Sequence, residues 1–64
     1  MAGSKVRTGG YYANRLDPTE IVVVKFLQQD DDNGEIVSYH EVGVRSMRQL
    51  QVDDFLAAYE RIRT

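Results

Sequence analysis

The residues with the most evident chemical potential are acidic, in the run Asp30-Asp31-Asp32-Asn33-Gly34-Glu35. Oxygen ligands around a central glycine are typical of calcium-binding loops. When Gly34 is aligned with the glycine of an EF-hand loop, Gln29 takes the first ligand position and His40 the last, where Asp and Glu are required. The run therefore predicts a solvated hairpin tip and no EF-hand metal site; the alternative is weak binding of a divalent cation by the three adjacent carboxylates. It remains a candidate binding surface through the charges of Asp30, Asp31 and Asp32.

Nucleophilic catalysis has a single candidate pair, Ser38 and His40, which lie two residues apart and so project from one face of a strand. A hydrolase triad also needs an orienting carboxylate and an oxyanion hole, which are usually built on a much larger scaffold. Gly9 and Gly10 lack the Lys-Ser/Thr of a phosphate loop. The absence of Cys excludes disulfides, thiolate zinc sites and iron–sulfur clusters. We therefore expect no enzyme and no cofactor.

Basic and aromatic side chains form a second candidate site. One of two adjacent tyrosines, together with nearby arginines, can contact phosphates or an acidic protein surface. Neighbouring residues of a strand point to opposite sides, so one tyrosine is expected in the core and the other exposed. The alternative is that the arginines only solvate the surface. The residues concerned are Tyr11, Tyr12, Arg15, Arg45 and Arg48.

The charge is unevenly distributed along the chain. The net charge is −2. Residues 1–16 carry +3, residues 17–41 carry −6 and residues 42–64 carry +1. The small net charge therefore hides a strong separation of charge along the chain, which favours electrostatically guided binding.

Length and composition limit the architecture to one small domain. A chain of 64 residues with 42% hydrophobic residues forms a small core, and a homodimer would add burial. The longest apolar run, residues 21–24, is far below the roughly 20 residues of a membrane span. The first residues lack the apolar segment of a signal peptide. The expectation is a soluble cytoplasmic protein.

The strongest structural pattern is a β-hairpin. Residues 20–28 and 36–44 are rich in β-branched and aromatic side chains, and Asn33-Gly34 between them favours a tight turn. Pairing apolar side chains with each other, and opposite charges with each other, predicts Val24 opposite Val42, Lys25 opposite Glu41 and Leu27 opposite Tyr39. One face would then hold Val22, Val24, Phe26, Ile36 and Val42, and the other Ile21, Val23, Leu27, Val37 and Tyr39. Two apolar faces indicate a strongly curled sheet or a dimer.

The flanking segments predict the remaining elements. Residues 1–9 are expected to form a flexible basic tail, and residues 10–64 one domain that begins with a short strand at Tyr11. Residues 45–52 alternate weakly and predict a last strand. Asp53 suits a helix N-cap, with Arg61 and Arg63 near the C-terminus. The apolar face of that helix would comprise Phe55, Leu56, Tyr59 and Ile62.

The order of these elements resembles a small SH3-like barrel. The carrying segments are residues 5–12 (KVRTGGYY), 22–24 (VVV), 37–39 (VSY) and 48–55 (RQLQVDDF). The chain is similar to short, mostly uncharacterised bacterial and bacteriophage modules, and to a lesser degree to KOW barrels. The resemblance implies a mainly β or α+β fold: a strongly curled antiparallel sheet of about four strands with one short C-terminal helix. The chain lacks the Trp with which SH3 domains bind proline-rich ligands.

Two classes of function follow as hypotheses. The first is a non-enzymatic protein-binding module, a phage or bacterial accessory or regulatory protein that docks on a larger host protein. The second is a small nucleic-acid-binding barrel that uses its basic first and last strands, which the net charge of −2 disfavours. A further variant makes the acidic hairpin a DNA mimic that occupies a basic groove on a host enzyme.

Overall fold

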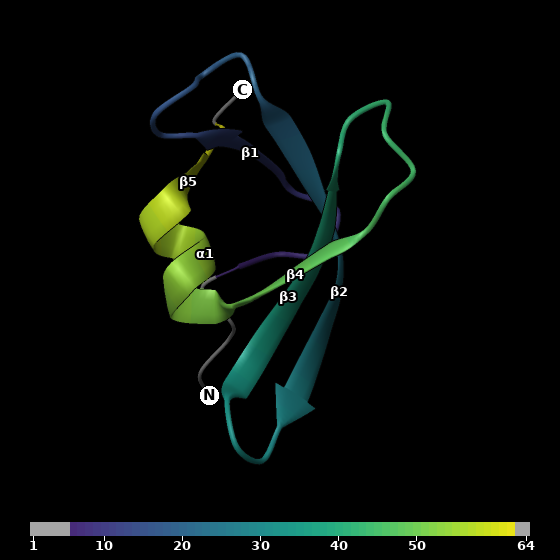
Figure 1. The fold of residues 1–64 in the computed structure, drawn as a ribbon, viewed down its shortest axis with the longest axis vertical. Coiled ribbons are helices and arrows are strands. Elements are labelled where there is room, and N and C mark those ends of the chain that lie inside the picture. The colour runs from purple at the N-terminus through teal and green to yellow at the C-terminus, as the bar shows by residue number, and fades with distance from the viewer. Residues whose placement is uncertain (1–5, 63–64) are drawn as a thin grey trace.

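One five-stranded antiparallel sheet and one short helix make up the computed structural model, which describes residues 6–62 (Figure 1). The strands follow the order β4-β3-β2-β1-β5, so β4 and β5 form the two edges of the sheet. The helix joins these edges in sequence and packs against β3, β4 and β5. The elements are β1 (Tyr11–Asn14), β2 (Ile21–Asp30), β3 (Gly34–Glu41), β4 (Arg48–Gln51), α1 (Val52–Ala58) and β5 (Tyr59–Arg61).

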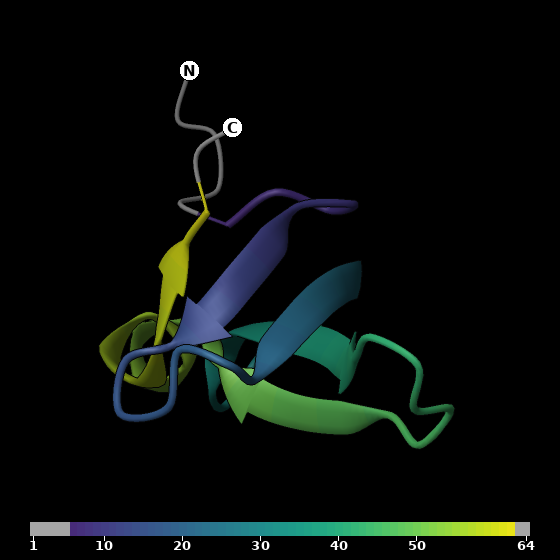
Figure 2. The same ribbon diagram turned by 90° about the horizontal axis from the view of Figure 1, so that it is seen from above.

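The predicted mainly β fold with one short helix is confirmed, and the strand count is five where about four were expected. The sheet is neither closed nor strongly curled, contrary to the prediction, because the strand pairings of residues 6–62 end at β4 and β5. Figure 2 shows the helix beside the sheet, with β5 continuing from it towards β1. In the part of the chain that the structure describes, no helix has the length and apolar character needed to cross a bilayer.

The fifth strand replaces the predicted second half of the helix. The helix ends at Ala58, and Tyr59–Arg61 pairs with β1, placing Tyr59 opposite Asn14 and Arg61 opposite Tyr12. Tyr59 and Ile62 therefore do not extend the helix face, and Arg63 lies outside the described residues. Helices this short gain little from local propensity, so hydrogen bonding to an open strand edge prevails.

The predicted N-cap is also wrong. Gln51 is the N-cap and makes no side-chain capping bond, whereas Asp53 and Asp54 lie within the first turn. Carboxylates there still interact favourably with the partial positive charge at the helix start.

The β2–β3 hairpin is confirmed, but its predicted register is wrong. Asp30 pairs with Gly34, which has a φ of +77°, a conformation that glycine adopts without steric cost. From this turn the ladder places Leu27 opposite Val37, and Val24 opposite Tyr39. The expectation rested on matching side chains, whereas turn geometry sets the register of a hairpin.

A β-bulge at Lys25 changes which side chains face the core. The ladder pairs Val24 with Tyr39 and Phe26 with Ser38, so Lys25 has no opposite residue. Val22 and Val24 consequently share the inner face with Val37 and Tyr39, contrary to the predicted division of faces. Phe26 and Val42, expected beside Val22 and Val24, are exposed.

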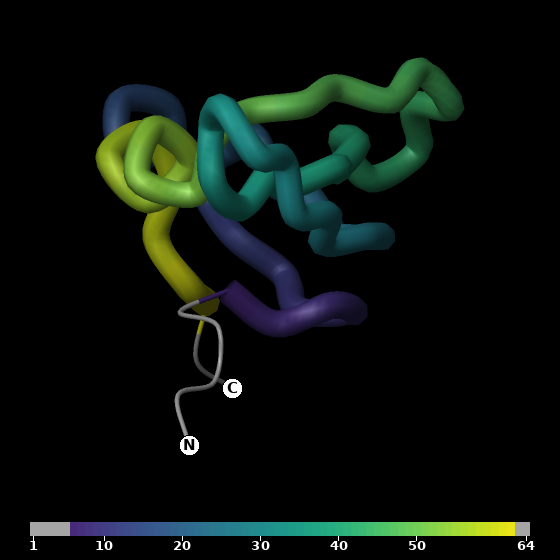
Figure 3. The backbone as a smooth tube through the Cα atoms, turned by 90° about the horizontal axis from the view of Figure 1, so that it is seen from below, coloured from purple at the N-terminus to yellow at the C-terminus, as the bar shows by residue number. Residues whose placement is uncertain are grey.

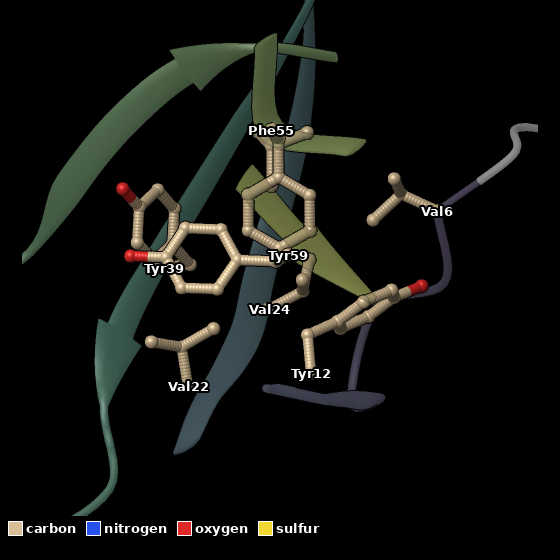
Figure 4. Close-up of a cluster of buried hydrophobic side chains, with 8 residues drawn as sticks. Val6, Tyr12, Val22, Val24, Tyr39, Phe55 and Tyr59 are labelled. Carbon is tan, nitrogen blue, oxygen red and sulfur yellow. The ribbon is translucent and has the colours of Figure 1, made fainter. Parts of the chain in front are cut away.

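The core lies between the inner face of the sheet and α1, and it is largely aromatic (Figure 4). The Phe55 ring is at the centre, with centroid distances of 5.0 Å to Tyr12, Tyr39 and Tyr59. Val6 is buried in the same cluster, although the sequence placed it in a tail. Residues 1–5 of that predicted tail lie outside the described residues. The other buried members are Val22, Val24 and Val37.

Candidate binding surface

The two adjacent tyrosines of β1 have different environments, as the alternation of a strand predicts. Tyr12 is 1% exposed and packs on Phe55, and its phenol oxygen accepts a hydrogen bond from the Arg7 amide at 3.2 Å. Tyr11 is 55% exposed on the other side of the sheet. Only Tyr11 is therefore available to a ligand.

Arg15 forms hydrogen bonds with the C-terminal end of the helix. Its Nε and Nη2 donate to the Leu56 carbonyl at 3.2 and 3.1 Å, and its Nη1 lies 3.0 Å from Glu60 Oε1. The last turn of α1 contains no basic residue of its own. Arg15 supplies the positive charge that the C-terminal carbonyls of a helix favour, so its role in this fold is structural.

Arg48 belongs to a network around Glu20, a residue that the sequence analysis missed. Arg48 Nη1 lies 3.2 Å from Glu20 Oε2, and the Tyr59 hydroxyl donates to the same oxygen at 3.2 Å. The other carboxylate oxygen accepts a bond from Asn14 Nδ2 at 2.8 Å. Glu20 precedes an apolar run directly after a turn, and nothing in its sequence position indicates this role.

The Glu20 network alters two pKa values. Burial raises the pKa of Tyr59 above its ordinary value, and the Tyr39 hydroxyl and the Glu20 carboxylate raise it further. For Arg48, desolvation lowers the pKa, but the electrostatic interactions with Tyr59 and with the Glu20 carboxylate outweigh it, so the net direction is upward. Arg48 is thus held as a cation within the fold.

The structure does not gather the predicted tyrosine–arginine patch into one surface. Arg15 and Arg48 bind groups of the helix and of the Glu20 network, whereas Arg45 lies exposed in the loop between β3 and β4. That loop projects on the opposite side of the molecule from α1 (Figure 3).

The predicted acidic site lies at the tip of the β2–β3 hairpin. Asp30 accepts bonds from the Asp32 amide at 2.9 Å and from Asn33 Nδ2 at 3.1 Å, and these bonds lower the pKa of Asp30. Asp30 therefore organises the turn. Asp31 and Asp32 are exposed, and their carboxylates make no hydrogen bond within the described residues. Over residues 6–62, no three His, Asp or Glu side chains converge as metal ligands would.

Ser38 and His40 do not form a nucleophile–base pair. The Ser38 hydroxyl is buried and accepts a bond from Gln49 Nε2 at 3.2 Å. His40 Nδ1 lies 2.9 Å from the Glu41 carbonyl oxygen. Each group is engaged with a neighbour other than its proposed partner.

Phe26 of β2, on the outer face of the sheet, and two residues of the β3–β4 loop form a surface that was not predicted as a site. Phe26 is 60% exposed, Met47 45% and Val44 40%, and we call these three residues the outer patch. Two hollows of about 420 and 550 Å3 share Phe26 and Met47 in their walls. The larger one is also lined by Lys25 and Arg45, which we call the cationic rim.

The bulge at Lys25 explains why this surface escaped prediction. Regular alternation from Val22 and Val24 would turn Phe26 inwards. The extra residue places Lys25 and Phe26, adjacent in sequence, both in exposed positions. A run of apolar residues gives no signal of where a bulge will fall.

Comparison with known proteins provides no further assignment: no family model, no curated protein and no solved structure matches this chain.

Proposed function

We propose that this protein is a non-enzymatic protein-binding module that docks on a larger protein through the outer patch. The observation that carries the proposal is the joint exposure of Phe26, Val44 and Met47 on one face. Full burial of one such side chain is worth roughly 1.5–3 kcal/mol. Contiguous exposed apolar residues rimmed by polar groups are typical of interaction sites.

The hollows beside the outer patch support this proposal. Their volumes, about 420 and 550 Å3, are within the range of ligand-binding clefts. Ser38 forms part of the wall of the smaller hollow, and its hydroxyl is already bonded to Gln49. This hollow therefore favours contact by an apolar group over chemistry at the serine.

We further propose that the order of the elements is that of a small SH3-like barrel which is open between its edge strands. The connection of β4 to β5 by α1 supports this architecture, as does the carboxylate of Glu20, which bonds Arg48 of β4 and Tyr59 of β5. The resemblance to bacterial and bacteriophage modules supports an accessory or regulatory role.

Affinity capture from a bacterial lysate, read by mass spectrometry, tests the docking proposal. We expect the unmodified chain to retain one or more proteins that a Phe26→Ser, Met47→Ser variant does not retain. Leu16→Ser is the matched control, because Leu16 is 96% exposed in the β1–β2 turn. Recovery of the same proteins by all three chains, or enrichment of none, would contradict the proposal.

A further inference from the structure

We propose that the outer patch and the cationic rim bind a short acidic and apolar segment of the partner protein. An apolar side chain would occupy the smaller hollow beside Phe26, and a carboxylate would interact with Lys25 and Arg45. The inference rests on the proposed function and names the chemistry of the partner.

The placement of Lys25 is the first step of the argument. As the bulged residue of β2, it is exposed beside Phe26 and unpaired in the ladder. Bulges often occur next to functional sites, where they redirect a side chain. Here the result is a cation adjacent to an aromatic ring on the outer face.

The two hollows differ in the charge of the residues that line them, so the two ends of a ligand lying across both would meet different surroundings. The smaller hollow is lined by neutral groups, namely Phe26, Leu27, Gln28, Ser38, Met47 and Gln49. The larger one holds both members of the cationic rim and is also lined by Val44 and His40. A segment lying across Phe26 and Met47 would therefore meet apolar and amide groups on one side and positive charge on the other.

The cations of the rim form no ion pair within the part of the chain that the structure describes. The two ion pairs in residues 6–62 join Arg15 to Glu60 and Arg48 to Glu20. Lys25 and Arg45 make no ion pair or side-chain hydrogen bond to another described residue. A carboxylate of a partner would therefore pair with these cations without displacing an ion pair of the described residues.

The acidic hairpin tip does not serve as that counterion. The tip and the β3–β4 loop lie at opposite ends of the molecule's long axis in Figure 1, and the chain extends 33 Å along this axis. At physiological ionic strength, interactions between exposed charges are largely screened beyond about 8 Å. The rim thus acts locally as a positive site on a chain of net charge −2.

An acidic protein segment fits this arrangement better than a nucleic acid. Two cations would neutralise at most two phosphates, whereas affinity for nucleic acids grows with the number neutralised. A longer polyanion would also be repelled by the segment of residues 17–41, which carries −6. A single carboxylate next to apolar contacts needs only the two cations present.

Titration of the isotope-labelled full chain with three synthetic peptides, followed by NMR, tests the inference. The probes are an acidic apolar peptide (DLEFDL), a basic apolar peptide (KLKFKL) and an acidic polar peptide (DSESDS). We expect DLEFDL to shift the amide signals of Lys25, Phe26 and Met47, with a dissociation constant at least tenfold lower than that of either control peptide.

Charge variants sharpen the test. Lys25→Glu with Arg45→Glu should reverse the preference between DLEFDL and KLKFKL, and Lys25→Gln with Arg45→Gln should remove it. Equal binding of the acidic and basic peptides, or shifts confined to residues outside the outer patch, would overturn the inference.

The capture experiment and the peptide titration together distinguish a failure of this inference from a failure of the proposed docking function, on which the inference rests. If capture of a partner depends on Phe26 and Met47 but the peptides show no charge preference, the docking function stands and the inference fails. If capture is indifferent to the outer patch, the docking function itself fails. Displacement of DLEFDL by a mixed-sequence single-stranded oligonucleotide at 150 mM salt would contradict both.

Discussion

The inner and outer faces of the sheet are built from the same strands, yet they handle apolar side chains in opposite ways. On the inner face, Phe55 is fully buried among tyrosine rings, and the Tyr59 hydroxyl is bonded to Glu20. Within residues 6–62, no buried side-chain nitrogen or oxygen lacks a hydrogen-bond partner. On the outer face, Phe26 is 60% exposed beside Lys25 and Arg45, which form no ion pair with another residue of the range 6–62. The inner face therefore accounts for the fold, and the outer face has features that the fold does not need.

The largest difference in the free energy of unfolding is expected between two variants in which one phenylalanine, on either side of the sheet, is truncated. Phe55→Ala is expected to lower the free energy of unfolding by about 3–5 kcal/mol, because it leaves a cavity among packed rings. Phe26→Ala should change it by about 0.5 kcal/mol or less, as for other surface positions. Urea denaturation followed by circular dichroism measures both values.

A chain of this size can be fully unfolded by the first change, so Phe55→Leu serves as the milder variant. It retains most of the buried volume and should destabilise less than Phe55→Ala but more than Phe26→Ala. Equal losses at positions 55 and 26 would refute the distinction between the faces.

Removal of the Glu20 carboxylate should give the second largest loss in the free energy of unfolding. Glu20→Ala is expected to cost about 1–3 kcal/mol, because it leaves the Tyr59 hydroxyl without its acceptor. The control is Glu60→Ala, which removes an exposed ion pair with Arg15 and should cost about 0–1 kcal/mol. Both values come from urea denaturation at pH 7. A Glu20 variant no less stable than the Glu60 variant would show that the network does not hold the edge strands.

Alkaline pH should reveal the environment of Tyr59. Because burial raises its pKa in the folded state, the folded protein retains this proton more tightly than the unfolded chain. This contribution to stability is complete below the unfolded value of about 10 and decreases as the pH rises above it. Tyr59→Phe should reduce the loss of stability between pH 9 and 11, measured by urea denaturation. Tyr11→Phe removes an exposed phenol on the outer face and should leave that loss unchanged.

The smallest effect is expected at the hairpin tip. Bonds from Asp32 and Asn33 lower the pKa of Asp30, so its stabilising contribution is present above the ordinary value of 3.8 and is lost as the pH falls through the lowered value. Asp30→Asn should reduce the decrease in melting temperature between pH 4 and 2. Asp31→Asn, at an exposed position without such bonds, should not. Identical acid profiles for these variants would contradict a turn-organising role for Asp30.

Local patterns in the sequence were sufficient for much of the fold. The β-branched runs and Asn33-Gly34 predicted the hairpin, and the aspartates predicted where the helix begins to within one or two residues. The alternation of a strand predicted that one of Tyr11 and Tyr12 would be buried. These features depend on neighbours in the sequence, which is why they could be inferred.

The predictions were wrong where contacts between residues far apart in the sequence determine the structure. Tyr59 continues a helical pattern in the sequence, but it lies in β5 because this segment pairs with the open edge of β1. The bulge at Lys25 redistributes side chains over both faces, so the outer patch was not foreseen. Arg15 and Arg48 are of a residue type common in binding patches, but Arg15 donates to the Leu56 carbonyl and Arg48 pairs with Glu20 within the fold. Arg45 alone of the three arginines lies at the surface proposed for binding.

Site-specific photo-crosslinking in bacterial cells tests the central claim most directly. p-Benzoylphenylalanine at position 26 should form covalent adducts with a partner protein, because this side chain lies within the outer patch. The same group at position 16, which is more exposed but remote from the hollows, should form few. Adducts of equal yield at both positions, or none at position 26, would contradict the assignment of the outer face as the docking surface.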